Sequence, residues 1–137
     1  MLRLYRFPIK GSYYYSADLA YQQDLLKVGN LLYLVPEPDN AHDSHALQIW
    51  SSTNPEQGYL IGYVPRQLAY LWQPMFPLNP NYPVTLSRSL AKGKQLRLEC
   101  DIALNVHWLK HLHILSWSLW LRQQHTLHSW LHSLFHR

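Results

Sequence analysis

The sequence predicts a mainly β protein: a compact barrel of short strands, with two short helices and a helical C-terminal extension. Six or seven short segments rich in Leu, Ile, Val and aromatic residues are separated by turn residues, which is typical of a barrel. Two other segments favour short helices, and few connections are long. The chain has 137 residues, of which 47% are apolar and 15% charged, and this suits one domain with a modest core.

The first half of the chain supplies four of the expected strands and one helix. Apolar and polar residues partly alternate over 2–7, which indicates a strand. Gly11 then permits a tight turn or a close backbone approach. A short helix is expected over 17–27, ended by Gly29 and Asn30. Further strands are expected over 31–35, 45–51 and 59–64.

The second half of the barrel begins with a short helix, expected over 66–73 after Pro65. Prolines then recur at every third position from Pro74 to Pro83, which fits either a docking segment for a proline-binding domain or a stiff loop. The last strands are expected over 83–90 and 95–104. In the latter, a period of two places Cys100 on the apolar face, as a core residue rather than a nucleophile.

Residues 105–137 differ in composition from the barrel segment 1–104, so we expect a domain boundary between them. The extension is rich in Trp, His and Leu and has neither Pro nor Gly, and its apolar residues recur at helical spacing. We therefore expect a helix over 107–136 that covers the barrel or buries a face against another chain. Alternation over 116–119 leaves a strand there as a second possibility.

Four histidines of the extension would share one face of such a helix. They are His125, His128, His132 and His136. This spacing fits either a zinc or nickel site or the weakly polar face of an amphipathic helix.

Charge and composition exclude several classes of protein. The net charge is +4, and the extension contains no acidic residue, which suits a nucleic acid or another anionic partner. The single cysteine excludes an internal disulfide and fits a reducing compartment. The N-terminus lacks the features of a signal peptide, and the most apolar stretch, 112–121, is too short to span a bilayer. We therefore expect a cytoplasmic protein without membrane contact.

Sequence motifs of the common enzyme classes are missing. The chain has no GxxxxGK[ST], GxGxxG, HExxH or GxSxG pattern, so nucleotide hydrolysis, dinucleotide binding, zinc proteolysis and serine hydrolysis have no support. We expect no cofactor, no metal and no catalysis.

Three motifs of the chain, in this order and spacing, resemble the HIRAN domain over roughly residues 3–104. The motifs are Gly11-Ser12-Tyr13-Tyr14-Tyr15, Glu37-Pro38-Asp39-Asn40-Ala41-His42-Asp43-Ser44-His45-Ala46 and Ile61-Gly62-Tyr63-Val64-Pro65-Arg66. The resemblance implies an OB-like or SH3-like barrel. It also implies binding of single-stranded DNA with a free 3′ end, as found in replication-fork or repair intermediates.

The resemblance assigns base stacking to the tyrosine triplet. In the family, an aromatic pair at this point stacks on the terminal bases, and Tyr14 and Tyr15 match that pair. Stacking of this kind is largely indifferent to base identity. Tyr13 stands where family members that bind DNA well have an arginine. The alternative is that the tyrosines are partly buried structural residues.

The resemblance assigns end recognition to the polar turn at the start of the second motif, residues 37–45. The residue matching Asp43 reads the 3′-hydroxyl in the family, with Asn40 lining the pocket and a basic residue at the position of Arg66 meeting backbone phosphate. His42 stands where an aromatic residue is usual, and it can still stack. Asp and Asn in such a turn can also serve the backbone alone, which leaves a purely structural role open. A metal or nuclease site around His42, Asp43 and His45 ranks last.

Two functions therefore remain from the sequence. The first is a non-catalytic module that binds the 3′ end of single-stranded DNA through Tyr13, Tyr14, Tyr15, Asn40, His42, Asp43 and Arg66. The second is a protein-interaction or assembly module that has lost DNA recognition and acts, or self-associates, through 105–137.

Overall fold

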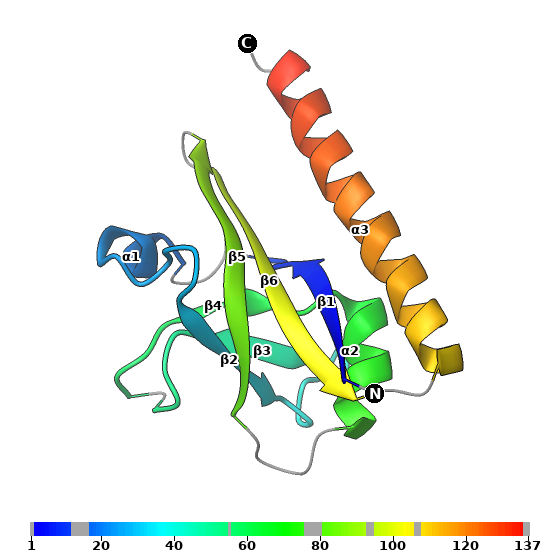
Figure 1. Ribbon diagram of the computed structural model, residues 1–137. Coiled ribbons are helices and arrows are strands. Elements are labelled where there is room, and N and C mark those ends of the chain that lie inside the picture. The colour runs from blue at the N-terminus through cyan, green and yellow to red at the C-terminus, as the bar shows by residue number, and fades with distance from the viewer. Residues whose placement is uncertain are drawn as a thin grey trace.

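The computed structural model describes residues 2–11, 17–54, 56–75, 81–92, 95–105 and 108–135. At 75, 92, 95, 105, 108–109 and 124–135 the description covers the backbone alone. The described residues form one six-stranded antiparallel sheet with three α-helices and a short 3₁₀ helix (Figure 1). The mainly β fold and the C-terminal helix predicted from the sequence are confirmed.

The sheet has the strand order β1-β6-β5-β2-β3-β4 and curls into a half-barrel (Figure 1). Its strands are β1 Leu2–Pro8, β2 Leu31–Pro36, β3 Leu47–Trp50, β4 Leu60–Tyr63, β5 Tyr82–Lys92 and β6 Gln95–Asn105. Every strand expected from the sequence is present, with small shifts at the ends.

The two ends of the sheet meet just after β1. The Ile9 amide still donates to the Leu98 carbonyl of β6 at 2.9 Å. The next residue, Lys10, instead pairs with Tyr63 of β4 through two backbone hydrogen bonds of 2.9 and 2.8 Å. The close approach requires Gly62, because a Cβ at this position would lie 2.4 Å from the Lys10 carbonyl oxygen.

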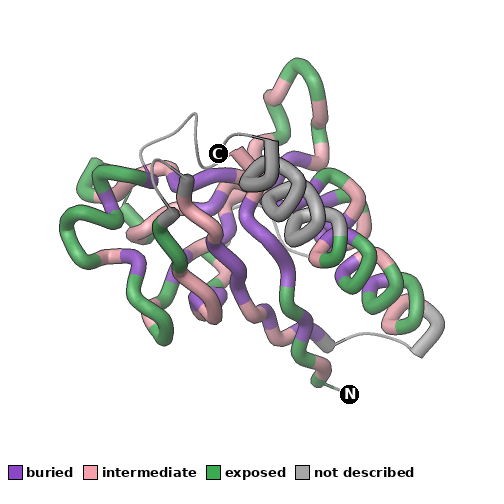
Figure 2. Tube along the Cα trace, turned by 90° about the horizontal axis from the view of Figure 1, so that it is seen from above, coloured by how far each residue is buried: buried purple, intermediate pink, exposed green. Residues whose placement is uncertain are grey.

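The core lies inside the curled sheet, as the buried segments in Figure 2 show. Alternate residues of β6 enter it, including Cys100, as the period of two predicts. Among the described residues, the largest fully buried side chain is Trp72 of helix α2 (Arg66–Trp72), which meets the ring of Phe7 edge to face at 5.2 Å. The 3₁₀ helix η1, Gln73–Met75, follows α2 directly.

The first helix is shorter than expected. The sequence predicts a helix over 17–27 that ends at Gly29, but α1 spans Ala17–Gln22. Asp24 adopts a left-handed φ of 63°, which Asp tolerates better than most residues. The chain turns there, and this turn brings Leu26 into the core at 2% exposure.

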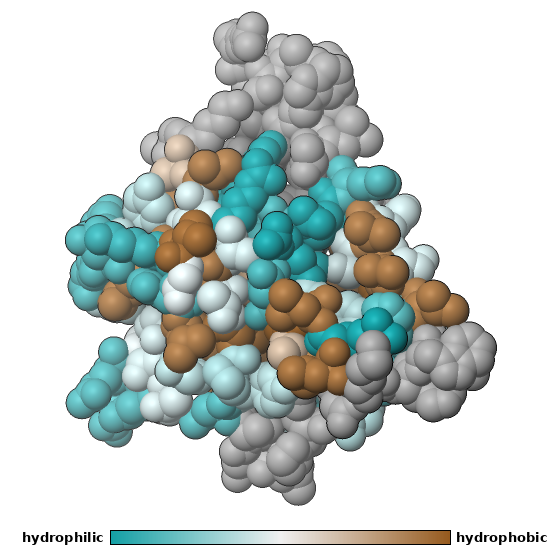
Figure 3. Space-filling model, viewed as in Figure 1, coloured by the Kyte–Doolittle hydropathy of each residue, from teal (hydrophilic) through white to brown (hydrophobic). Residues whose placement is uncertain are grey.

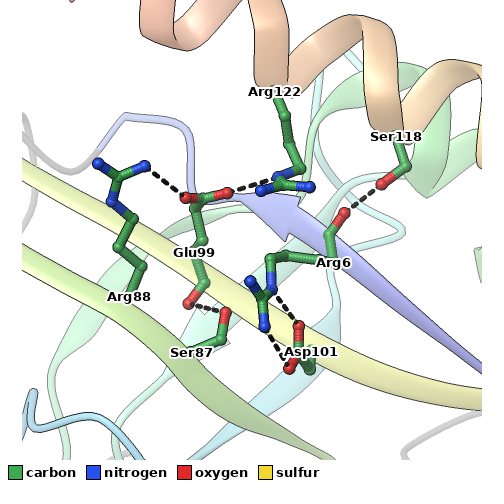
Figure 4. A network of polar contacts seen from close by, with 7 residues as sticks. All are labelled: Arg6, Ser87, Arg88, Glu99, Asp101, Ser118 and Arg122. Atoms are coloured by element: carbon green, nitrogen blue, oxygen red, sulfur yellow. Dashed lines mark hydrogen bonds and ion pairs between the residues drawn. The ribbon is translucent and has the colours of Figure 1, made fainter.

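Helix α3, Trp108–Phe135, lies along β1, the strand at one end of the sheet (Figure 1). The Ser118 hydroxyl donates to the Arg6 carbonyl of β1, so the helix satisfies a backbone group on the free edge of the sheet. The Arg122 side chain reaches Glu99 of β6 at 2.7 Å (Figure 4). The expectation that the extension covers the barrel is confirmed at this edge.

Some expectations for the second half of the chain lie outside the described residues. These are the placement of Pro77 and Pro80, of the His125, His128 and His132 side chains, and of His136. Of the other two prolines in that series, Pro74 belongs to η1 and Pro83 to β5. Within the described residues, no helix combines the length and hydrophobicity needed to cross a membrane.

Candidate nucleic-acid interface

A pocket of about 370 Å³ opens where the polar turn, β4 and the start of α2 meet. It is lined by Lys10, Asn40, His42, Asp43, Ala46, Tyr63, Val64 and Arg66. Its volume is near the lower end of the range for small-molecule sites. The four described residues to which the sequence assigned DNA contacts thus share one pocket: Asn40, His42 and Asp43 come from one turn, and Arg66 comes from the start of α2.

Asn40 holds the shape of the turn. Its Oδ1 accepts hydrogen bonds from the backbone amides of His42 at 2.9 Å and Asp43 at 3.0 Å. Its Nδ2 donates to Glu37 Oε1 at 2.7 Å. Because both ends of the amide group serve the turn, Asn40 positions the pocket wall, and this is the structural role that the sequence left open for it.

Glu37 anchors the turn to the sheet, a role that the sequence analysis did not assign. Its carboxylate accepts hydrogen bonds from Asn40, from Gln48 of β3 and from the Tyr63 hydroxyl of β4, the last at 2.8 Å. Gln48 in turn accepts a hydrogen bond from the Trp50 indole at 2.8 Å. The only indication of this role in the sequence was the position of Glu37 at the start of the polar motif.

The two carboxylate oxygens of Asp43 have different surroundings, one in the turn and one at the pocket. Its Oδ1 accepts the backbone amide of His45 at 2.9 Å, which caps the turn before β3. Its Oδ2 lies 3.9 Å from Arg66 Nε, an ion-pair distance that is too long for a hydrogen bond. The Asp43 side chain is 19% exposed and that of Arg66 is 77% exposed. Oδ2 can therefore receive a hydrogen bond from a ligand, and Arg66 can move to meet an anion.

Lys10 is a pocket residue that the sequence analysis missed, because a single lysine before Gly11 carries no signal by itself. Burial lowers the pKa of its amine from the ordinary value. With Arg66, it sets two cations against the one carboxylate of Asp43 in the pocket lining. Such an excess of positive charge suits a ligand that combines phosphate and hydroxyl groups.

The tyrosine triplet, Tyr13, Tyr14 and Tyr15, lies outside the described residues. Its position in the chain is still informative, because the triplet follows closely after Lys10, which lines the pocket. The residue between them that the structure describes, Gly11, has a φ of 78°, which is natural for glycine and costly for other residues.

The two histidines of the turn differ in environment. His42 is exposed at the pocket, where a flat ring can meet a base. His45 is half-buried and packs edge to face on Tyr70 of α2 at 5.0 Å, with Nδ1 3.8 Å from Asp43 Oδ1. Among the described residues, no three His, Cys, Asp or Glu side chains are grouped closely enough to hold a metal ion.

Cys100 is expected to resist thiol reagents in the folded protein. It is fully buried, and burial, followed by the charges of Asp101 and Glu99, raises the pKa of its thiol well above the ordinary value. The thiolate that reacts is therefore scarce. Labelling with a chromogenic disulfide should follow global unfolding in denaturant, and rapid labelling in buffer would contradict this placement.

The curled sheet, with a charged pocket at the junction of its two ends, defines a small half-barrel domain. The family model of the HIRAN domain matches residues 2–107, so the chain belongs to the HIRAN family. That family consists of DNA-binding domains, and membership implies binding of nucleic acid. Comparisons with curated proteins and with solved structures gave no match. Helix α3 begins just beyond the matched residues.

Proposed function

We propose that this protein is a non-catalytic module that binds single-stranded DNA at a free 3′ end, as found in replication-fork or repair intermediates. One observation carries the proposal. The pocket combines a carboxylate that can accept a hydroxyl proton with two cations that can meet phosphate. A lone buried cysteine fits a reducing compartment, and the proposal places the protein in the cytoplasm.

The polar residues in and beside the pocket divide the work of recognition in the proposal. Asp43 Oδ2 accepts the hydrogen bond of the terminal 3′-hydroxyl, while Asn40 and Glu37 keep the turn in place. Arg66 and Lys10 contact backbone phosphates. His42 stacks on a base at the pocket mouth.

Tyr14 and Tyr15 stack on the terminal bases in this proposal, and Tyr13 replaces the arginine of better DNA binders. We therefore expect affinity in the micromolar range at moderate salt. Substituting Tyr14 or Tyr15 by alanine should weaken binding by roughly 1–3 kcal/mol each if they stack.

The test compares strands that differ only at one terminus. Internally labelled single strands of about ten nucleotides, ending in a 3′-hydroxyl, a 3′-phosphate or a 5′-phosphate, are titrated by fluorescence anisotropy. A 3′-phosphate faces the Asp43 carboxylate and loses the hydrogen bond, so binding should weaken roughly ten- to hundredfold. A 5′-phosphate should have little effect.

Substitutions of Asp43 separate recognition from folding. Asp43→Asn removes the charge but keeps an oxygen for the His45 amide, so the turn should persist while discrimination against 3′-phosphate is largely lost. Asp43→Ala should also erase the discrimination.

Arg66→Ala and Lys10→Met should weaken the binding of all strands alike and flatten its salt dependence.

Equal affinity for the two 3′ ends in the unmodified protein, or binding to neither, would contradict the proposal. The alternative function, protein interaction or assembly through the C-terminal extension, would then be favoured. The observation behind that alternative is the apolar outer surface of α3.

A further inference from the structure

Helix α3 is fixed to the barrel by one of its faces. Ile114 and Leu121 are buried in the core, and the Tyr5 hydroxyl is hydrogen-bonded to His111 Nδ1 at 2.6 Å. The Ser118 and Arg122 contacts described above belong to the same face. Because apolar packing, a hydrogen bond to the edge of β1 and an ion pair act together, the barrel presents α3 in one orientation.

An outward side of α3 carries an exposed apolar stripe, with His113 and Ser116 also exposed beside it. Leu112, Leu115, Leu119 and Trp120 each expose between 38% and 54% of their surface. Figure 3 shows hydrophobic side chains following the described part of α3 at the right of the molecule, and Figure 2 shows buried and exposed positions alternating along it. The stretch 112–121 contains no Lys, Arg, Asp or Glu. Exposed apolar surface of this kind usually marks an interface.

We propose that this outer face of α3 pairs with the same face of a second copy of the chain, as an antiparallel helix pair about a two-fold axis. In a two-fold dimer the same patch of both copies meets, so the patch must be complementary to itself. The stripe meets this condition, because it contains no Lys, Arg, Asp or Glu and pairing therefore buries no such charge within it.

The dimensions of α3 suit such a pairing. Its 28 residues extend over about 42 Å, and the exposed stripe from Leu112 to Trp120 covers about 12 Å of that length, or about two helical turns along which side chains can interdigitate. Leu2 and Leu4 of β1 are also exposed, and Leu2 pairs with Asn105, close in the chain to the start of α3.

The lack of charged residues on the stripe favours a second copy of the chain over a charged protein partner or a lipid surface. An acidic or basic protein partner would need complementary charges, and a lipid surface is usually met by several Lys or Arg flanking the apolar face. Among the described side chains of α3, the cations are Lys110 and Arg122, and Arg122 is already paired with Glu99. The pairing does not depend on DNA binding, because the stripe contains none of the pocket residues.

Sedimentation of the full chain from about 1 to about 200 µM tests the proposal. We expect a reversible monomer–dimer equilibrium. Leu112→Glu and Trp120→Glu place a charge at the two ends of the stripe without replacing any anchoring residue; Trp120 also meets Trp117 edge to face at 5.4 Å, so Leu112→Glu is the cleaner of the two. Each should raise the dimer dissociation constant at least about tenfold. Val28→Glu, an equally polar change at an exposed apolar residue of the loop before β2, is the control and should leave the equilibrium unchanged.

Circular dichroism and the DNA titration of the same variants complete the test. Retained secondary structure and retained DNA affinity, together with loss of the dimer, would support the proposal and separate it from the DNA-binding function. A monomer at every concentration, or a dimer unaffected by both stripe variants, would overturn it. Monomeric protein that floats with vesicles of phosphatidylserine and phosphatidylcholine would overturn it in favour of a lipid surface.

Discussion

Replacement of Gly62 by alanine is expected to lower the free energy of unfolding by about 3 kcal/mol. The added Cβ would lie 2.4 Å from the Lys10 carbonyl oxygen and 2.7 Å from Ile9 Cγ2. Neither neighbour can move easily, because Ile9 is buried and Lys10 is held by both backbone hydrogen bonds to Tyr63. Relief of the clash must separate β4 from the segment after β1, which opens the half-barrel at its junction.

The same change should also weaken DNA binding, because Lys10 and Tyr63 form one wall of the pocket. Chemical denaturation and the 3′-end titration measure the two effects. Gly29→Ala is the matched control: Gly29 has a φ of 96° but nothing within 4 Å of the added carbon. Its cost should be near 1 kcal/mol, from backbone strain alone, with DNA affinity retained. Equal losses in the two variants would show that the junction accommodates a side chain.

Local periodicity was sufficient to predict most of the fold. In β6, alternation placed Leu98, Cys100 and Ile102 inside, and all three are buried. The end of α1 could not be predicted in the same way. Gly29 was the strongest stop signal nearby, but the need to bury Leu26 turns the chain earlier, and that need depends on contacts remote in sequence.

Local patterns were less informative about the candidate site. The grouping of Asn40, Asp43 and Arg66 was expected from the resemblance to a family, not from spacing, since a turn and a helix start converge only in the folded sheet. No sequence pattern indicated the contribution of Lys10. It depends on the segment after β1, which leaves β6 and pairs with β4 at this residue. The roles of Tyr14 and Tyr15 remain predictions.

The burial of Glu99 also could not be predicted from its own strand. Alternation assigns Glu99 and Asp101 to the polar face of β6, and both carboxylates pair with arginines (Figure 4). The Glu99 side chain is nevertheless only 6% exposed. It lies between Arg88 of β5 at 3.3 Å and Arg122 of α3 at 2.7 Å, so the packing of neighbouring elements decides its environment, not the alternation of its own strand.

Glu99→Ala is therefore expected to destabilise the protein by about 2–3 kcal/mol, because two arginines lose a shared, buried partner. The cost stays below that of a fully buried pair, since both arginines can partly reach solvent. Asp101→Ala is the matched control on the same face of the same strand: its partner Arg6 is 46% exposed, and the cost of the lost pair should be below about 1 kcal/mol. Urea denaturation measures both changes, and a double-mutant cycle of Glu99 with Arg122 isolates the contact between β6 and α3. A coupling energy near zero would mean that α3 is held by apolar packing and by the hydrogen bonds of His111 and Ser118, and that the ion pair contributes nothing to its docking.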